Sequence, residues 1–143
     1  MAIYGIGAYF DRDVTDEFIK KELVGIGYDR GDAPELHEFI KALKVGDIVY
    51  IKSYSPSAEN ILVKGVGIIT NSELITPQNT EDLIKIARHV RWLSIQQFEI
   101  KPPIERNNVR RNTMYEEWHP TVQNEIMMHV LNRLSGRSSL LGA

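Results

Sequence analysis

The fold is decided by Lys44-Val45-Gly46-Asp47-Ile48-Val49-Tyr50-Ile51-Lys52-Ser53 and by the following Ile61-Leu62-Val63-Lys64-Gly65-Val66-Gly67-Ile68-Ile69. Glycine tolerates the positive φ of a tight turn, and aspartate can hydrogen-bond its own backbone there, so Gly46-Asp47 predicts a turn after a helix end. The β-branched and aromatic residues that follow predict a strand over about residues 47–53. A second strand is expected over about 61–70. Glycine within it predicts a bulge or sharp bend, as when a small sheet curls toward a barrel.

Length and composition favour one globular domain over residues 1–143. Apolar residues make up 43% of the chain and charged residues 25%, which is ordinary for a soluble protein. No apolar run approaches the roughly 20 residues that a membrane span needs, and the N-terminus does not resemble a signal peptide. The chain contains no cysteine, which excludes disulfides, thiolate catalysis and cysteine-bound zinc. These features predict a cytoplasmic protein that does not enter the membrane.

Charge is unevenly distributed along the chain. The net charge is −2, which gives no support for binding long nucleic acid. Acidic residues outnumber basic ones over residues 1–100, whereas basic residues outnumber acidic ones over residues 101–143. The second region either provides a local basic loop for phosphate or is simply a solvated surface.

Hydrophobic periodicity and capping residues predict the remaining elements. Strands are expected over about residues 3–10, 89–93 and 97–101, and helices over about 14–23, 32–43, 80–87 and 120–134. Asp32 and Glu35 have the spacing of a capping box, and Gly136 is expected to end the last helix and leave a frayed tail over 135–143. Residues 102–119 show no periodicity, and such long loops in compact domains are often functional.

Catalytic and cofactor motifs are missing from the sequence. The four histidines (His37, His89, His119 and His129) lack metal-ligand spacing, and there is no Gly-x-Ser-x-Gly elbow, Walker motif or complete dinucleotide fingerprint. We therefore expect a protein that is not an enzyme and needs neither a metal nor a cofactor.

Two groups of residues have the chemistry of a base-binding site. The first combines aromatic rings with polar neighbours, because bases are recognised by stacking and by hydrogen bonds to their edges. It comprises Tyr28, Asp29, Lys52, Ser53, Tyr54 and Trp92. Trp92 also fits the alternative that it is a core residue of a strand.

The second group lies in the long loop and comprises Arg110, Arg111, Thr113, Tyr115 and Glu116. Arginine holds phosphate through paired hydrogen bonds or stacks on a base, and a carboxylate can accept from the N–H edge of guanine. The alternative is that both arginines pair with Glu116 and Glu117 while the loop packs through its aromatic residues.

The order of these features resembles the PUA-like superfamily, and within it the EVE-like domains. The resemblance depends on Gly27-Tyr28, the Lys44–Lys52 turn and strand, Lys64-Gly65-Val66-Gly67-Ile68, and Val90-Arg91-Trp92. It implies an α+β fold: a small bent mixed β-barrel flanked by helices. The barrel core would span about 3–101, followed by a functional loop over about 102–119 and a C-terminal helix over about 120–134.

Domains of this kind bind nucleotides, RNA or modified DNA bases in an aromatic and polar cleft. The resemblance therefore implies a nucleotide or nucleobase ligand. One hypothesis is non-enzymatic binding of a purine-containing nucleotide, such as a cyclic defence signal sequestered by a phage or bacterial sponge protein. The other is a reader of modified bases in DNA or RNA. A second apolar side on the last helix (Met127, Met128, Leu131) is either a homo-oligomer face or buried against the domain, and we favour burial.

Overall fold

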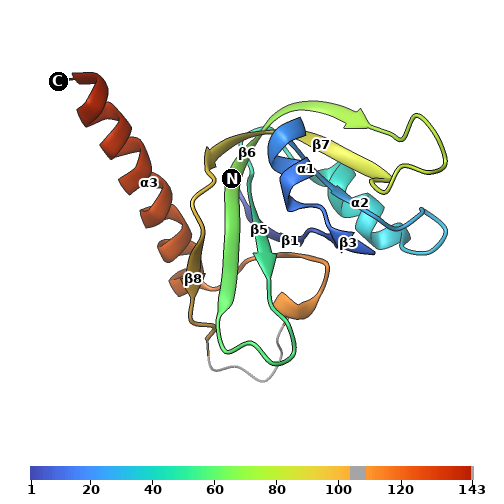
Figure 1. Ribbon diagram of the computed structural model, residues 1–143, viewed down its shortest axis with the longest axis horizontal. Helices are drawn as coiled ribbons and strands as arrows, with labels where there is room; N and C mark the ends of the chain where they lie inside the picture. Colours follow the sequence, from blue (N-terminus) through green and yellow to red (C-terminus); the bar gives the residue numbers. More distant parts are fainter. Residues whose placement is uncertain (104–108, 143) are drawn as a thin grey trace.

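The computed structural model describes residues 1–103 and 109–142 and has a mixed α+β architecture (Figure 1). The predicted α+β class is confirmed. In chain order the elements are β1 (Ile3–Gly7), β2 (Tyr9–Phe10), β3 (Arg12–Asp13), α1 (Thr15–Lys21), β4 (Leu23–Ile26), α2 (Pro34–Ala42), β5 (Ile48–Ser53), β6 (Ile61–Ile75), β7 (Ile86–Ser94), β8 (Phe98–Ile100), the 3-10 turn η1 (Val109–Arg111), β9 (Met114–Glu116) and α3 (Pro120–Gly142).

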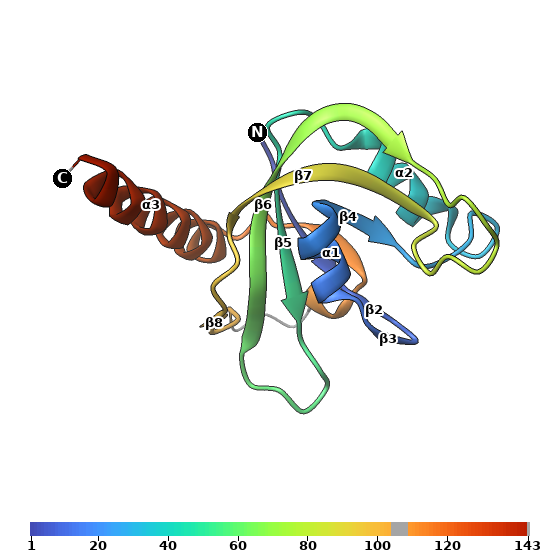
Figure 2. The same ribbon diagram turned by 45° about the horizontal axis from the view of Figure 1, so that its top comes forward.

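A bent sheet of seven strands forms the centre of the molecule. Its order is β4-β7-β6-β5-β1-β9, and β8 pairs with the start of β6. β1 and β5 are parallel, and the other pairs in this sheet are antiparallel. The long strand β6 arches across the molecule and pairs first with β5 and then with β7 (Figures 1 and 2). This arch gives the sheet its curvature.

The turn that begins β5 has the predicted chemistry. Gly46 has φ of 94°, a left-handed value that glycine adopts without a steric penalty. The buried carboxylate of Asp47 accepts hydrogen bonds from the backbone N–H of Lys44 (2.8 Å) and of Ala2 (3.0 Å). The predicted irregularity in the second strand is also confirmed, since the β6–β7 register shifts between Val66 and Gly67. The turn and the strand irregularity predicted from the sequence are therefore both confirmed.

The sheet is open, so the predicted barrel is not supported. Among the described residues, its edge strands β4 and β9 pair only with β7 and β1 respectively. Both edges nevertheless contribute to one core, through Val24 and Ile26 of β4 and Met114 of β9. Phe18 of α1 and Ile40 of α2 belong to the same core. Side chains of the two helices therefore cover this core between the edge strands, and no hydrogen bonds join β4 to β9 in the described residues.

A second core lies on the other face of the sheet, beneath α3. Val122, Ile126 and Val130 of α3 pack there with Tyr50 of β5 and Ile61 of β6. The helix α3 lies on the opposite side of the molecule from α1 and α2, and its C-terminal end projects away from the sheet (Figures 1 and 2). Within the described residues, no helix is both long enough and apolar enough to cross a bilayer.

Several predicted boundaries are wrong. The helix expected over 80–87 is instead a loop that leads into β7, which begins at Ile86. In this loop the Asp82 carboxylate accepts from the backbone N–H groups of Gln78 and Asn79, and Asn79 in turn accepts from Glu81. Such local side-chain bonds compete with helix formation. The cap of α2 is Ala33 rather than Asp32, without a side-chain bond.

The last helix and the long loop also differ from expectation. α3 continues to Gly142 rather than ending near 134, since one glycine costs a helix only about 1 kcal/mol. The loop expected over 102–119 contains η1 and β9. Its residues 104–108, and Ala143 of the expected tail, lie outside the described residues.

Candidate functional site

A cleft of about 350 Å³ lies where β1, β5, β6 and η1 meet. We call it the lysine cleft. It is lined by Gly7, Ala8, Tyr9, Asp13, Lys52, Ser53, Tyr54, Ser55, Lys64, Arg111 and Thr113. It combines three cations, one carboxylate, three hydroxyl side chains and two aromatic rings, and these are the groups that recognise phosphate and heterocycles.

Strand pairing brings these residues together. β1 and β5 are parallel and end side by side, with Gly7 opposite Lys52. The β5–β6 register shifts at Lys52, because Ile51 pairs with Gly65 whereas Lys52 pairs with Val63. Lys64 is therefore the extra residue of a β-bulge, a feature that redirects side chains beside binding sites. Residue Thr113 joins the cleft because its carbonyl accepts from the backbone N–H of Gly7 (2.8 Å).

Lys52 is the most unusual group in the cleft. The residue is only 8% exposed, and no acceptor in the described part of the chain hydrogen-bonds its ammonium. Its Nζ lies 5.8 Å from the ring centroid of Tyr115, which is a weak favourable contact. Burial lowers the pKa of Lys52 to about 8. A desolvated cation that opens onto a cleft has the chemistry to bind an anion.

Lys64 is neutralised by a neighbour. Its Nζ lies 2.9 Å from Asp13 Oδ2, while Asp13 Oδ1 accepts from the backbone N–H (2.9 Å) and hydroxyl (2.6 Å) of Thr15. Burial would raise the pKa of Asp13, but the bonds from Thr15 and Lys64 outweigh it and lower the pKa to about 2. The pair fastens β3 to β6 and leaves Lys52 and Arg111 as the cations available to a ligand.

Arg111 is held in position on the opposite wall. Its guanidinium carbon lies 4.2 Å from the ring centroid of Tyr54, and Nη1 donates to the carbonyl oxygen of Ser55 (2.9 Å). Its other N–H donors make no hydrogen bond to a described residue. A guanidinium that is stacked and anchored at one edge is pre-organised to bind an anion with its remaining edge.

A buried charge network fixes η1, from which Arg111 extends. Arg110 donates through Nε and Nη2 to the Glu117 carboxylate (2.9 and 2.6 Å), and the Tyr50 hydroxyl donates to the same carboxylate (2.8 Å). The Tyr115 hydroxyl bonds that of Tyr50 (2.7 Å). Burial lowers the pKa of Arg110, but the bonds and charge of Glu117 outweigh this effect and raise the pKa overall. Arg110 is therefore charged and positions the loop.

Residues 11–117 match a family model described as a domain of unknown function, DUF8426. The chain belongs to the DUF8426 family. The match includes every residue of the lysine cleft except Gly7, Ala8 and Tyr9, and it ends before α3. No curated protein matches the chain.

This DUF8426 protein brings five of the predicted site residues into one cleft. They are Lys52, Ser53, Tyr54, Arg111 and Thr113. Two others, Arg110 and Tyr115, lie behind the cleft in the buried network, where Glu117 and Tyr50 occupy their polar atoms. The alternative weighed from the sequence, that loop arginines pair with loop carboxylates, thus describes Arg110 but not Arg111.

The remaining predicted residues lie elsewhere. Trp92 packs against the first core, and its indole N–H donates to the carbonyl of Phe18 (3.2 Å), so it is a structural residue. Glu116 lines a separate hollow with Trp118 on the outer side of β9. Asp29 lies in the exposed loop before α2, beside Tyr28.

Tyr28 lines a second opening of about 480 Å³, which we call the tyrosine cleft. Its lining is Tyr9, Phe10, Asp11, Gly27, Tyr28, Thr80, Glu81, Asp82, Leu83 and Lys85. Tyr9 lines both clefts.

Six lysine-cleft residues were not predicted, and Tyr9, Asp13 and Lys64 are those with an aromatic or charged side chain. Alternation along Ile3–Phe10 would have pointed Tyr9 outward from a buried Phe10, and it is in fact 73% exposed. Lys64 precedes the glycine at which a bulge was expected. Asp13 offered no comparable signal, because its role depends on a partner 51 residues away.

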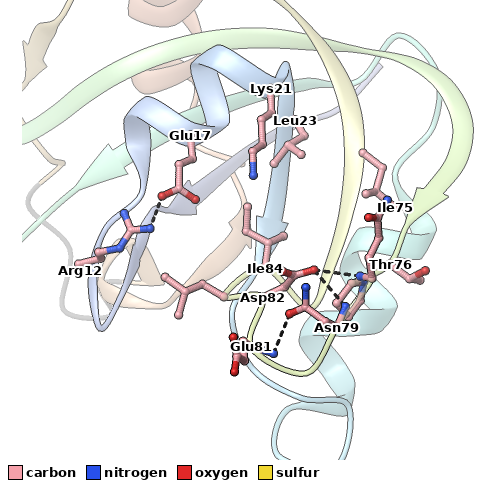
Figure 3. Close-up of a pocket in the computed structure, with 13 residues that line it drawn as sticks. Arg12, Glu17, Lys21, Leu23, Ile75, Thr76, Asn79, Glu81, Asp82 and Ile84 are labelled. Carbon is pink, nitrogen blue, oxygen red and sulfur yellow. Dashed lines mark hydrogen bonds and ion pairs between the residues drawn. The ribbon is translucent and has the colours of Figure 1, made fainter.

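A third opening is a less suitable site. It has a volume of about 490 Å³ and lies between the β2–β3 hairpin and the loop before β7 (Figure 3). Several of its polar groups already have partners: Arg12 pairs with Glu17, and Asp82 accepts from backbone N–H groups of its own loop. Within the described residues, no cluster of histidines and carboxylates suits a metal ion.

Replacing Lys52 by methionine is expected to stabilise the fold at pH 7 by about 1–3 kcal/mol, since a poorly solvated charge is removed while the apolar stem is kept. The folded-state pKa of about 8 lies below the ordinary value of 10.5. Between these values the unfolded chain binds more protons, so wild-type stability rises with pH and the advantage of the variant disappears. Urea unfolding at pH 7, 9 and 10.5 measures both effects.

Lys64→Met is the matched control for that experiment. It breaks the pair with Asp13 and is expected to be neutral or slightly destabilising. Equal effects of the two substitutions would contradict our description of Lys52 as a desolvated, unpaired group.

Proposed function

We propose that this protein binds a purine-containing nucleotide in the lysine cleft without transforming it. The observation that carries the proposal is Lys52: its side chain is mostly buried, its ammonium lacks a hydrogen-bond partner among the described residues, and it lies in the same cleft as Arg111. A phosphate between Lys52 and Arg111 would give both cations the charge-assisted bonds that they lack.

Aromatic and hydroxyl groups support a heterocycle beside that phosphate. Tyr9 offers an exposed ring at the rim of the cleft, and stacking on aromatic rings is how proteins hold bases with little sequence preference. Tyr54 serves mainly as the surface on which Arg111 lies. The hydroxyls of Ser53 and Thr113 are available to bind ribose or a base edge.

Binding alone is proposed because no histidine and no unengaged carboxylate is found among the described residues that line the cleft. Among the described residues that line it, Asp13 is the one carboxylate, and it is already bonded to Lys64 and Thr15. Binding without turnover would sequester its ligand. We therefore propose a cytoplasmic sponge, and a cyclic nucleotide of antiviral defence is the first ligand class to test. The bent sheet and flanking helices fit the EVE-like resemblance in outline, without a closed barrel.

Isothermal titration against linear and cyclic purine nucleotides tests the proposal. Lys52→Gln and Arg111→Gln are each expected to weaken binding by about 10- to 150-fold, because each removes a charge-assisted hydrogen bond. Lys20→Gln removes an exposed lysine of α1 that does not line the cleft, and it should have no effect. If no nucleotide binds more tightly than about millimolar, the proposal is wrong.

Two further measurements separate the alternatives. A nucleotide that contacts two cations should lose affinity gently with salt, whereas a reader of modified bases in DNA or RNA would contact several phosphates and lose it steeply. Chromatography of the nucleotide after incubation detects turnover. Either a steep salt dependence or a product peak would favour a different function.

A further inference from the structure

We infer that the ligand extends beyond the lysine cleft into the tyrosine cleft and carries at least two bases, one on each side of Tyr9. This inference rests on the proposed function and specifies its ligand class. Its basis is that the Tyr9 ring, 73% exposed, lines both openings, so they are neighbouring parts of one surface. A single mononucleotide with its phosphate at Lys52 would leave Tyr28 unused.

Tyr9 and Tyr28 lie near each other because the residues next to them in the chain, Phe10 and Gly27, are in contact. Phe10 packs directly on Gly27: a methyl group at Gly27 would lie 2.5 Å from the Phe10 ring, so only glycine permits this approach. Phe10 is buried, whereas Tyr9 before it and Tyr28 after Gly27 are exposed. The buried contact therefore fixes two outward-facing aromatic residues on adjacent segments of the rim.

The backbone that carries Tyr28 is also anchored. The buried His37 of α2 donates from Nε2 to the carbonyl oxygen of Tyr28 (2.6 Å). The next carbonyl, that of Asp29, accepts from the backbone N–H groups of Asp32 (3.0 Å) and Ala33 (3.1 Å). The Tyr28 ring is 50% exposed on this restrained loop. A large ring kept outward on a restrained backbone loses little conformational entropy when a base stacks on it.

The charges of the two clefts are complementary to different parts of such a ligand. The lysine cleft has an excess of cations and suits phosphate, with Lys52 as its desolvated, unpaired group. The tyrosine cleft has three carboxylates (Asp11, Glu81 and Asp82) against one cation, Lys85. This excess disfavours a second phosphate. Asp82 already accepts from backbone N–H groups of its own loop, which leaves Asp11 and Glu81 to accept hydrogen bonds from the amino and ring N–H groups of a base. The contrast favours a base, rather than a longer phosphate chain, beside Tyr28.

The test compares linear 5′-phosphorylated dinucleotides, pApA and pGpG, with ADP and GDP. The diphosphates supply a second phosphate without a second base. We expect the better dinucleotide to bind about 5- to 150-fold more tightly than its diphosphate, which is the range for stacking one further base. Tyr28→Ala should abolish this gain and leave mononucleotide binding unchanged. Tyr28→Phe should retain the gain, because it keeps the ring.

The outcomes distinguish this inference from the proposed function. If AMP or GMP binds in a Lys52-dependent manner but the dinucleotide gains nothing over the diphosphate, or Tyr28→Ala leaves the gain intact, the two-cleft ligand is wrong and the proposed function stands. If no purine nucleotide binds at all, both are wrong. A gain that requires an aromatic ring at position 28 supports both.

Discussion

Replacing Glu117 by glutamine is expected to lower the free energy of unfolding by about 3–5 kcal/mol. Glu117 is 1% exposed and is the partner of Arg110, which is 4% exposed. The substitution keeps the shape of the side chain but removes its charge, so the Arg110 guanidinium is left in the interior without an anion. The cost should appear in urea unfolding monitored by circular dichroism, with an unchanged dependence on urea concentration.

A double-mutant cycle identifies the cause of that loss. Arg110→Met alone should also be costly, because the Glu117 carboxylate then lacks its cation and keeps only neutral donors, including Tyr50. The combined Arg110→Met and Glu117→Gln variant has no buried net charge, and it should cost clearly less than the sum of the single changes. Additive effects would show that the two residues are not coupled. A large coupling would support the role of Arg110 in fixing η1, the turn from which Arg111 extends.

The same pair shows what sequence alone could predict about the site. Arg110 and Arg111 are adjacent, both were candidates for phosphate, and nothing local distinguishes them. They differ because η1 turns one guanidinium toward Glu117 and the other toward Tyr54. Orientation within a short irregular turn depends on tertiary packing, which periodicity does not encode. Lys52 was predictable as a candidate, since it ends a strong strand pattern, but its lack of a partner was not.

Fold prediction succeeded where chemistry is local and failed where it is not. The turn at Gly46 and the bulge in β6 follow from residues within the turn or strand itself. Whether the sheet closes depends instead on what fills the space between β4 and β9, and Phe18 and Ile40 from two helices contribute to that filling. These residues read as ordinary apolar faces of helices in the sequence. Whether the sheet closes therefore could not be predicted from the residues of the strands alone.

Nucleotide affinity is expected to fall about fivefold between pH 8 and pH 9 and about sevenfold between pH 9 and pH 10, or roughly 40-fold in all. The free protein holds the pKa of Lys52 at about 8, because burial disfavours its charged form. A phosphate beside the ammonium favours that form and raises the pKa toward 10.5, the ordinary value. Above pH 8 each binding event must therefore take up a proton, and the dissociation constant rises with pH. Isothermal titration in buffers of different ionisation enthalpy measures the proton uptake directly.

Lys52→Gln is the decisive comparison for this prediction. The variant binds weakly at pH 7 but has no amine to protonate at this position, so its affinity should be nearly independent of pH from 7 to 10. Any remaining slope reports other groups, such as the tyrosines of the rim, and is subtracted from the wild-type slope. The measurements start at pH 7 because a terminal phosphate loses its last proton near pH 6. If wild type and variant have equal slopes, Lys52 does not meet the anion, and the lysine cleft loses the group on which its proposed chemistry depends.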